Sequence, residues 1–88
     1  MTPDTHAARP RIAVLADDLI WATRLADGVR AAGASPLPAR TADGLAELLP
    51  GVDLVVVDLT ARSYDGVEAI AAARVAGRPV LAVGQHDD

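Results

Sequence analysis

The stretch Leu54-Val55-Val56-Val57-Asp58 is the clearest feature of the chain, since four apolar residues run without interruption into a carboxylate. With Val52 before it, this run predicts the strongest strand, over residues 52–57, and Asp58 is expected to open a loop. A similar run over residues 11–16 ends at Asp17-Asp18, and a third occupies residues 79–83. Strands without alternating polar residues are typical of parallel sheets that helices cover on both faces.

Helical patterns separate the predicted strands. The first helix is expected over residues 19–32, where Asp17 and Asp18 can cap its start and Gly33 can end it. A short second helix is expected over residues 42–49, and a third from Asp65 to about residue 76. Because helices alternate with strands, the sequence predicts an α/β fold with an open, doubly wound parallel sheet.

A weaker strand is expected over residues 34–39, in which Pro36 and Pro38 stand at alternate positions. Proline has no backbone N–H to donate, so this strand can lie only at an edge of the sheet. The expected strand order is therefore 2-1-3-4, with the first and third strands as neighbours. Residues 1–10 are expected to form a flexible polar leader, and residues 11–88 a single domain.

The composition excludes several classes of function. The 88 residues are 51% hydrophobic and 23% charged, which is typical of one small globular domain. The absence of cysteine excludes disulfides, thiolate metal sites and cysteine nucleophiles. A formal net charge of −4 disfavours nucleic acid as a partner, because binding to phosphates needs a basic surface. No apolar run approaches the ~20 residues that span a membrane, and no signal peptide is visible, so a cytoplasmic location is expected.

Three aspartates follow the two strands that are expected to be neighbours: Asp17 and Asp18 after the first, and Asp58 after the third. Ligands bind beyond the carboxyl ends of the strands in such sheets, so these side chains are expected to converge. Three carboxylates in one place favour a bound Mg²⁺ ion, and an exposed Asp58 beside it can accept a phosphoryl group. The alternative is structural, with Asp17 and Asp18 as helix caps and Asp58 as a turn residue.

These residues resemble a response-regulator receiver domain, which is CheY-like and flavodoxin-like in fold. Residues 17–24 resemble the start of its first helix, and residues 78–83 its fourth strand. Residues 55–59, followed by Asp65-Gly66-Val67-Glu68, resemble the phosphoacceptor strand and the loop into the third helix. The likeness covers residues 11–86, which is nearly the whole chain.

The resemblance implies a role for each residue of the acidic edge. Asp58 would be the phosphoacceptor and Asp18 the main magnesium ligand, with Asp17 as an auxiliary acid and the carbonyl of Thr60 as a further ligand. It also implies Mg²⁺ as cofactor and a histidine kinase of a two-component system as the phosphoryl donor. The domain would be a signalling module and not an enzyme.

The sequence also departs from the family pattern. Where a receiver ends its fourth strand with a Ser or Thr hydroxyl, this chain has Gly84. The lysine that pairs with the phosphoryl group has no counterpart, since all eight basic residues are arginines. The last helix, strand and helix of a full receiver do not follow the fourth strand. The chain is therefore expected either to be part of a longer protein or to complete its sheet as a homodimer.

Two alternatives to a phosphoacceptor stay open. The first is a phosphorylation-independent pseudo-receiver that acts as an interaction or dimerisation module, which Gly84 and the missing lysine favour. The second is an enzyme of the haloacid dehalogenase type, which also uses an aspartate nucleophile. Its first motif needs a second aspartate where this chain has Thr60, so the enzyme is the weaker alternative.

Overall fold

The computed structural model describes residues 9–84, so most of the predicted leader, residues 1–8, lies outside the described part of the chain. The elements, in order, are β1 (Arg11–Leu15), α1 (Leu19–Ala31), β2 (Ser35–Ala39), α2 (Ala42–Leu48), the 3₁₀ turn η2 (Leu49–Gly51), β3 (Leu54–Asp58), α3 (Gly66–Val75) and β4 (Val80–Val83). Among these residues no helix is long and apolar enough to cross a membrane.

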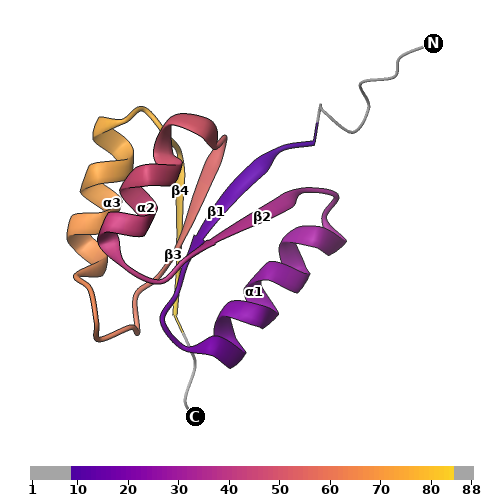
Figure 1. The fold of residues 1–88 in the computed structure, drawn as a ribbon, viewed down its shortest axis with the longest axis horizontal. Coiled ribbons are helices and arrows are strands. Elements are labelled where there is room, and N and C mark those ends of the chain that lie inside the picture. The colour runs from indigo at the N-terminus through magenta and orange to yellow at the C-terminus, as the bar shows by residue number, and fades with distance from the viewer. Residues whose placement is uncertain (1–8, 85–88) are drawn as a thin grey trace.

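The four strands form one parallel sheet in the order β2-β1-β3-β4, which confirms the predicted topology. Helix α1 lies on one side of the sheet, and α2 and α3 lie on the other (Figure 1). The predicted helix starts are also confirmed. The Asp18 side chain accepts a hydrogen bond from the backbone N–H of Trp21, and the Asp65 side chain accepts from Val67 and Glu68. Gly33, at φ 87°, follows α1 in a conformation that favours glycine.

Strand β3 begins and ends later than the sequence pattern indicates. Val52 is buried but precedes the strand, because Asp53 pairs with the backbone of Arg11: its N–H donates to the Arg11 carbonyl and its carboxylate accepts from the Arg11 N–H. At the other end, Asp58 is the last strand residue and lies opposite Val83 of β4. The expectation that Asp58 opens the loop was wrong, because the ladder with β4 continues through it.

The core lies between the sheet and the pair α2 and α3. Its fully or nearly buried members come from alternate positions of β1 and β3, from the end of β2, from the residue after the 3₁₀ turn, from α2 with its 3₁₀ extension, and from α3: Ala13, Leu15, Ala39, Leu45, Leu49, Val52, Val55, Val57, Ala69 and Ala73. Many are small, so the layers pack closely without large side chains. The opposite side is thinner, since α1 contains no buried residue and lies mainly against β1 and β2.

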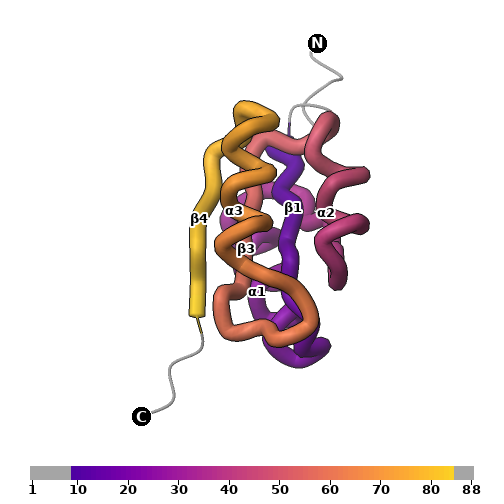
Figure 2. Tube along the Cα trace, turned by 90° about the vertical axis from the view of Figure 1, so that its left-hand side faces the viewer, coloured from indigo at the N-terminus to yellow at the C-terminus, as the bar shows by residue number. Residues whose placement is uncertain are grey.

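The two edge strands differ from the prediction in one respect. Pro36 and Pro38 lie in β2 at the sheet edge, as expected. Strand β4 was expected to be covered on both faces, but Leu81 and Ala82 are exposed and Val80 and Val83 are only half-buried. The reason is topological: β4 is the other edge, and α1 does not extend over it (Figure 2).

Candidate functional site

The candidate site is the carboxyl edge of the sheet, where β1 and β3 end side by side. Leu15 of β1 is in register with Val57 of β3, so Asp17 and Asp58 leave the sheet at the same edge. The 59–65 loop passes over this edge and contributes Thr60, Ser63 and Tyr64. The prediction that two distant segments meet here is therefore confirmed for the backbone. The side chains decide what the edge can do.

Asp58 is fully buried, with 0% of its surface exposed. Its Oδ1 accepts hydrogen bonds from the backbone N–H of Thr60 at 2.9 Å and from the Thr60 hydroxyl at 2.6 Å. Its Oδ2 is also buried but has no hydrogen-bond partner among the described residues. One oxygen of the carboxylate is therefore occupied by the chain's own loop, and the other is shielded from solvent.

Asp17 and Asp18 are engaged in separate local contacts. The Oδ2 of Asp17 accepts from the Ser63 hydroxyl at 2.7 Å and from the backbone N–H groups of Ser63 and Arg62, at 3.1 and 3.3 Å. The Ser63 hydroxyl, helped by these N–H groups, holds the pKa of Asp17 below its ordinary value. Asp18 caps α1 through Trp21, as the structural alternative predicted. Asp17 instead anchors the 59–65 loop.

Tyr64 joins the ends of the two central strands. Its hydroxyl lies 2.9 Å from the carbonyl oxygen of Leu15 and 2.7 Å from that of Asp58, so one proton is shared between two acceptors. Burial, the charge of Asp58 and the charge of Asp17 raise the pKa of Tyr64, in that order of importance. Tyr64 therefore holds the loop against β1 and β3 in its neutral form.

We expect the Tyr64→Phe variant to be less stable than the wild type by about 1–3 kcal/mol at neutral pH, since two buried carbonyls lose their donor. Ionised tyrosine is disfavoured in the folded state, so this stabilisation is present below the pKa of an unfolded tyrosine, about 10, and is lost as the pH rises above it. Urea unfolding between pH 7 and 11 measures both effects. The alkaline loss of stability should occur in the wild type only.

Composition makes this test specific. The chain has one tyrosine, no cysteine and no lysine, so Tyr64 is the only side chain expected to titrate between about pH 9 and 12. Tyrosinate absorbance of the folded protein should appear at a higher pH than that of the urea-unfolded protein. Equal midpoints for the two states would mean that the Tyr64 hydroxyl is not held as described.

Among the described residues, the carboxylate side chains do not by themselves form a metal site. Mg²⁺ needs oxygen ligands that converge in octahedral geometry. Among residues 9–84, no three acidic or histidine side chains are grouped so that they can hold a metal ion. The magnesium ligands inferred from the sequence, Asp17, Asp18, Asp58 and the carbonyl of Thr60, therefore stay a prediction.

The end of β4 completes the edge next to Thr60. A Cβ atom placed on Gly84 would lie 3.6 Å from the Cγ2 of Thr60, which is an ordinary van der Waals contact. A serine or threonine would therefore fit at position 84, so crowding does not explain the glycine there.

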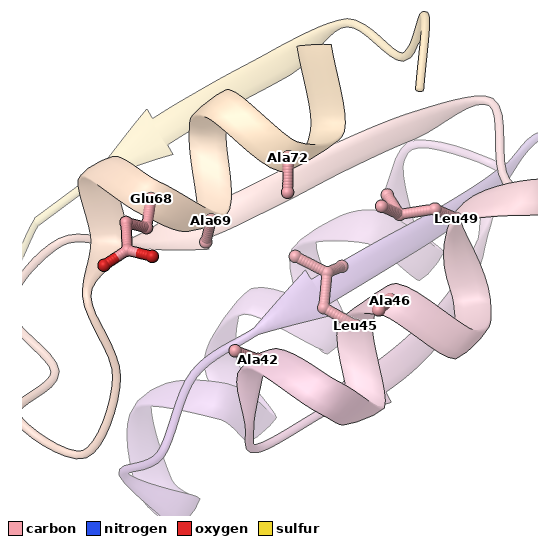
Figure 3. Close-up of a pocket in the computed structure, with 7 residues that line it drawn as sticks. All are labelled: Ala42, Leu45, Ala46, Leu49, Glu68, Ala69 and Ala72. Carbon is pink, nitrogen blue, oxygen red and sulfur yellow. The ribbon is translucent and has the colours of Figure 1, made fainter. Parts of the chain in front are cut away.

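A cavity lies between α2 and α3, away from the carboxyl edge of the sheet (Figure 3). It has a volume of about 130 Å³ and is lined by Ala42, Leu45, Ala46, Leu49, Glu68, Ala69 and Ala72. Glu68 is its one charged lining residue and stands at the N-terminal end of α3. The other six lining residues are apolar, and four of them are alanines, whose small side chains leave space between the two helices. The lining contains no group of polar side chains that could bind or transform a ligand.

Sequence reasoning missed the contributions of Ser63 and Tyr64. Neither residue is among the site residues predicted from the sequence. Both act through contacts to residues 46 and 49 positions away, Asp17 and Leu15. No local spacing rule reports such contacts. The one available signal was that Tyr64 is the single tyrosine of the chain and lies in the loop that follows the acidic strand end.

No protein-family model and no curated protein matches the sequence. Solved structures do match. A response-regulator receiver protein from Pseudomonas putida superposes with a TM-score of 0.75 at 22% identity, over 92% of this chain and 72% of that chain. A CheY-like receiver domain from Methanospirillum hungatei superposes with a TM-score of 0.74 at 18% identity, over 92% of this chain and 68% of that one.

The chain has a shortened receiver fold. A receiver domain from Francisella gives the same result, with a TM-score of 0.73 and 20% identity over 91% of this chain and 69% of that chain. For eight of the solved chains that it matches, the protein spans between 56% and 72% of their length. The receiver resemblance seen in the sequence is thus confirmed at the level of fold, with the four-stranded part of the receiver present.

Proposed function

We propose that this receiver-fold domain takes part in signalling through protein contacts and without phosphorylation of Asp58. The observation that carries the proposal is the complete burial of the Asp58 carboxylate. In-line phosphoryl transfer needs an approach to a free carboxylate oxygen, and neither oxygen of Asp58 is open to solvent. The receiver fold supports a place in two-component signalling, where domains act by binding other signalling proteins.

Two further features support the proposal. Asp17 is engaged with the loop and Asp18 with α1, and among residues 9–84 no three acidic side chains are grouped around a possible metal position. Gly84 stands where a receiver has a Ser or Thr, and glycine has no hydroxyl that could hydrogen-bond a phosphoryl group. The acids of the predicted site are therefore engaged in other contacts, and the hydroxyl at position 84 is missing.

The phosphoacceptor is the second candidate, and one observation favours it. Among residues 9–84, the Oδ2 of Asp58 has no hydrogen-bond partner, and it lies at the edge that Asp17 shares. Movement of the 59–65 loop would expose this oxygen to Mg²⁺ and to the phosphohistidine of a kinase. This candidate requires the contacts of Thr60 and Ser63 with the carboxylates to break first.

A small-molecule phosphoryl donor separates the two candidates. The chain is incubated with acetyl phosphate and Mg²⁺, and its intact mass is measured, with Asp58→Asn as the matched control. We expect no phosphoryl adduct on either protein. An adduct on the wild type that is absent from Asp58→Asn would contradict the proposal and establish the phosphoacceptor.

A further inference from the structure

The two edges of the sheet differ in whether their outer backbone groups can pair with another strand. In β2, the N–H of Ser35 donates to Pro10, and the carbonyl of Ala39 accepts from Ala16. The backbone N–H and C=O groups of residues 35, 37 and 39 therefore point toward β1. Pro36 and Pro38 stand at the alternate positions, where the backbone points away from the sheet. Proline has no N–H, so this edge cannot be extended by a regular strand.

The β4 edge has no such protection. The carbonyls of Pro79 and Val83 accept from the N–H groups of Val55 in β3 and of Leu59 directly after it. The alternate residues Val80 and Ala82 therefore turn their N–H and C=O groups outward. No strand lies beyond β4 among the described residues (Figure 2). The strand Val80–Val83 contains neither a charge nor a proline, the usual devices that keep an edge strand from pairing.

Apolar surface flanks this edge on both sides of the sheet. On the α1 side, Leu81 is 54% exposed and borders, with Val83, a groove of about 310 Å³ between α1 and the strands. On the α3 side, Val67 is 73% exposed, and a hollow of about 320 Å³ is bordered by the apolar Ile70, Pro79 and Val80 and by two arginines, Arg74 and Arg78. A partner that pairs with β4 would cover apolar side chains on both faces at once.

We propose that a second copy of this chain pairs with β4 in antiparallel orientation about a two-fold axis. Two four-stranded sheets then join into one continuous sheet. In this arrangement the outward N–H and C=O groups of Val80 and Ala82 exchange hydrogen bonds with the copy. The inference rests on the proposed function, because it names a partner for a domain that acts through protein contacts.

The charges along α3 favour the antiparallel copy. Helix α3 has Asp65 and Glu68 at its start and Arg74 in its last turn, and Arg78 follows it. It lies over β3 and β4, so a two-fold axis at the edge places α3 and its copy about 10 Å apart, the usual spacing of packed helices. The acidic start of each helix then lies toward the basic end of the other, and like charges are kept apart.

Sedimentation of the 88-residue chain tests the dimer. We expect the wild type to sediment with twice its mass of 9.0 kDa at high concentration and to dissociate on dilution. Ala82→Pro gives β4 the same feature that β2 carries, a proline at an outward position. Leu81→Lys adds a charge beside it. Both variants are expected to sediment as monomers, while the control Ile20→Lys, an exposed site on α1, should stay dimeric.

Hydrogen exchange of the wild type locates the interface independently of any variant. The amides of Val80 and Ala82 should be protected in the dimer and should lose that protection on dilution. A wild type that stays monomeric while folded would overturn the inference, and so would a dimer in which these two amides exchange freely. Either result leaves the phosphorylation experiment unaffected, so failure of the dimer is distinguishable from failure of the proposed function.

Discussion

Leu15→Ala is expected to lower the free energy of unfolding by about 2–5 kcal/mol. Leu15 is 0% exposed and belongs to the core cluster with Leu45 and Val57. Truncation leaves a cavity beneath α2 and α3 that small alanine neighbours cannot fill. Because small domains are stable by only about 5–15 kcal/mol, the variant loses a large share of its total stability.

Urea unfolding followed by circular dichroism measures this loss. Leu19→Ala is the matched control, because Leu19 is 67% exposed at the first position of α1. The control should change the free energy of unfolding by less than about 0.5 kcal/mol. Equal effects of the two substitutions would contradict the assignment of the core to the α2 and α3 side of the sheet.

Asp58→Asn is expected to raise the free energy of unfolding by about 1–3 kcal/mol. The carboxylate is fully buried, one of its oxygens has no hydrogen-bond partner within the described part of the chain, and Asp17 leaves the sheet at the same edge. Asparagine keeps an acceptor for the N–H and hydroxyl of Thr60 while it removes the buried charge. The effect has the opposite sign to that of most substitutions of buried residues.

Asp17→Asn is the control variant, because it is expected to change the free energy of unfolding in the opposite direction. Its carboxylate accepts three hydrogen bonds from Ser63 and Arg62, so loss of its charge should lower the free energy of unfolding by up to about 1 kcal/mol. Thermal and urea unfolding of the two variants at pH 7 give the comparison. A destabilised Asp58→Asn would mean that the charged carboxylate is stabilised by contacts other than those described.

The sheet was predictable because its signals are local and repeated. Uninterrupted apolar runs identified β1 and β3, and Pro36 and Pro38 placed β2 at an edge. The bounds of β3 were shifted because its ends are set by pairing with Arg11 and Val83, residues that are distant in the sequence. The exposure of β4 depends on which strands α1 covers, and apolar composition alone does not report that.

The sequence predicted where the candidate site lies in the fold, but not which contacts its side chains make. Strand order placed Asp17 and Asp58 at one edge, and helix-start rules correctly gave Asp18 a capping role. The side-chain contacts of Asp17 and Asp58 depend on the path of the 59–65 loop. That path is fixed by Tyr64 through two backbone carbonyls, a contact that no residue pattern reveals.

The most direct test of the central claim is an amide NMR titration of the chain with Mg²⁺ and beryllofluoride, a mimic of the phosphoryl group. Because the Asp58 carboxylate is closed off by Thr60 and shielded from solvent, we predict no shift of the resonances of residues 58–64, of Asp17 or of Gly84. Saturable shifts at these residues that disappear in Asp58→Asn would contradict the account and identify the domain as a phosphorylation switch.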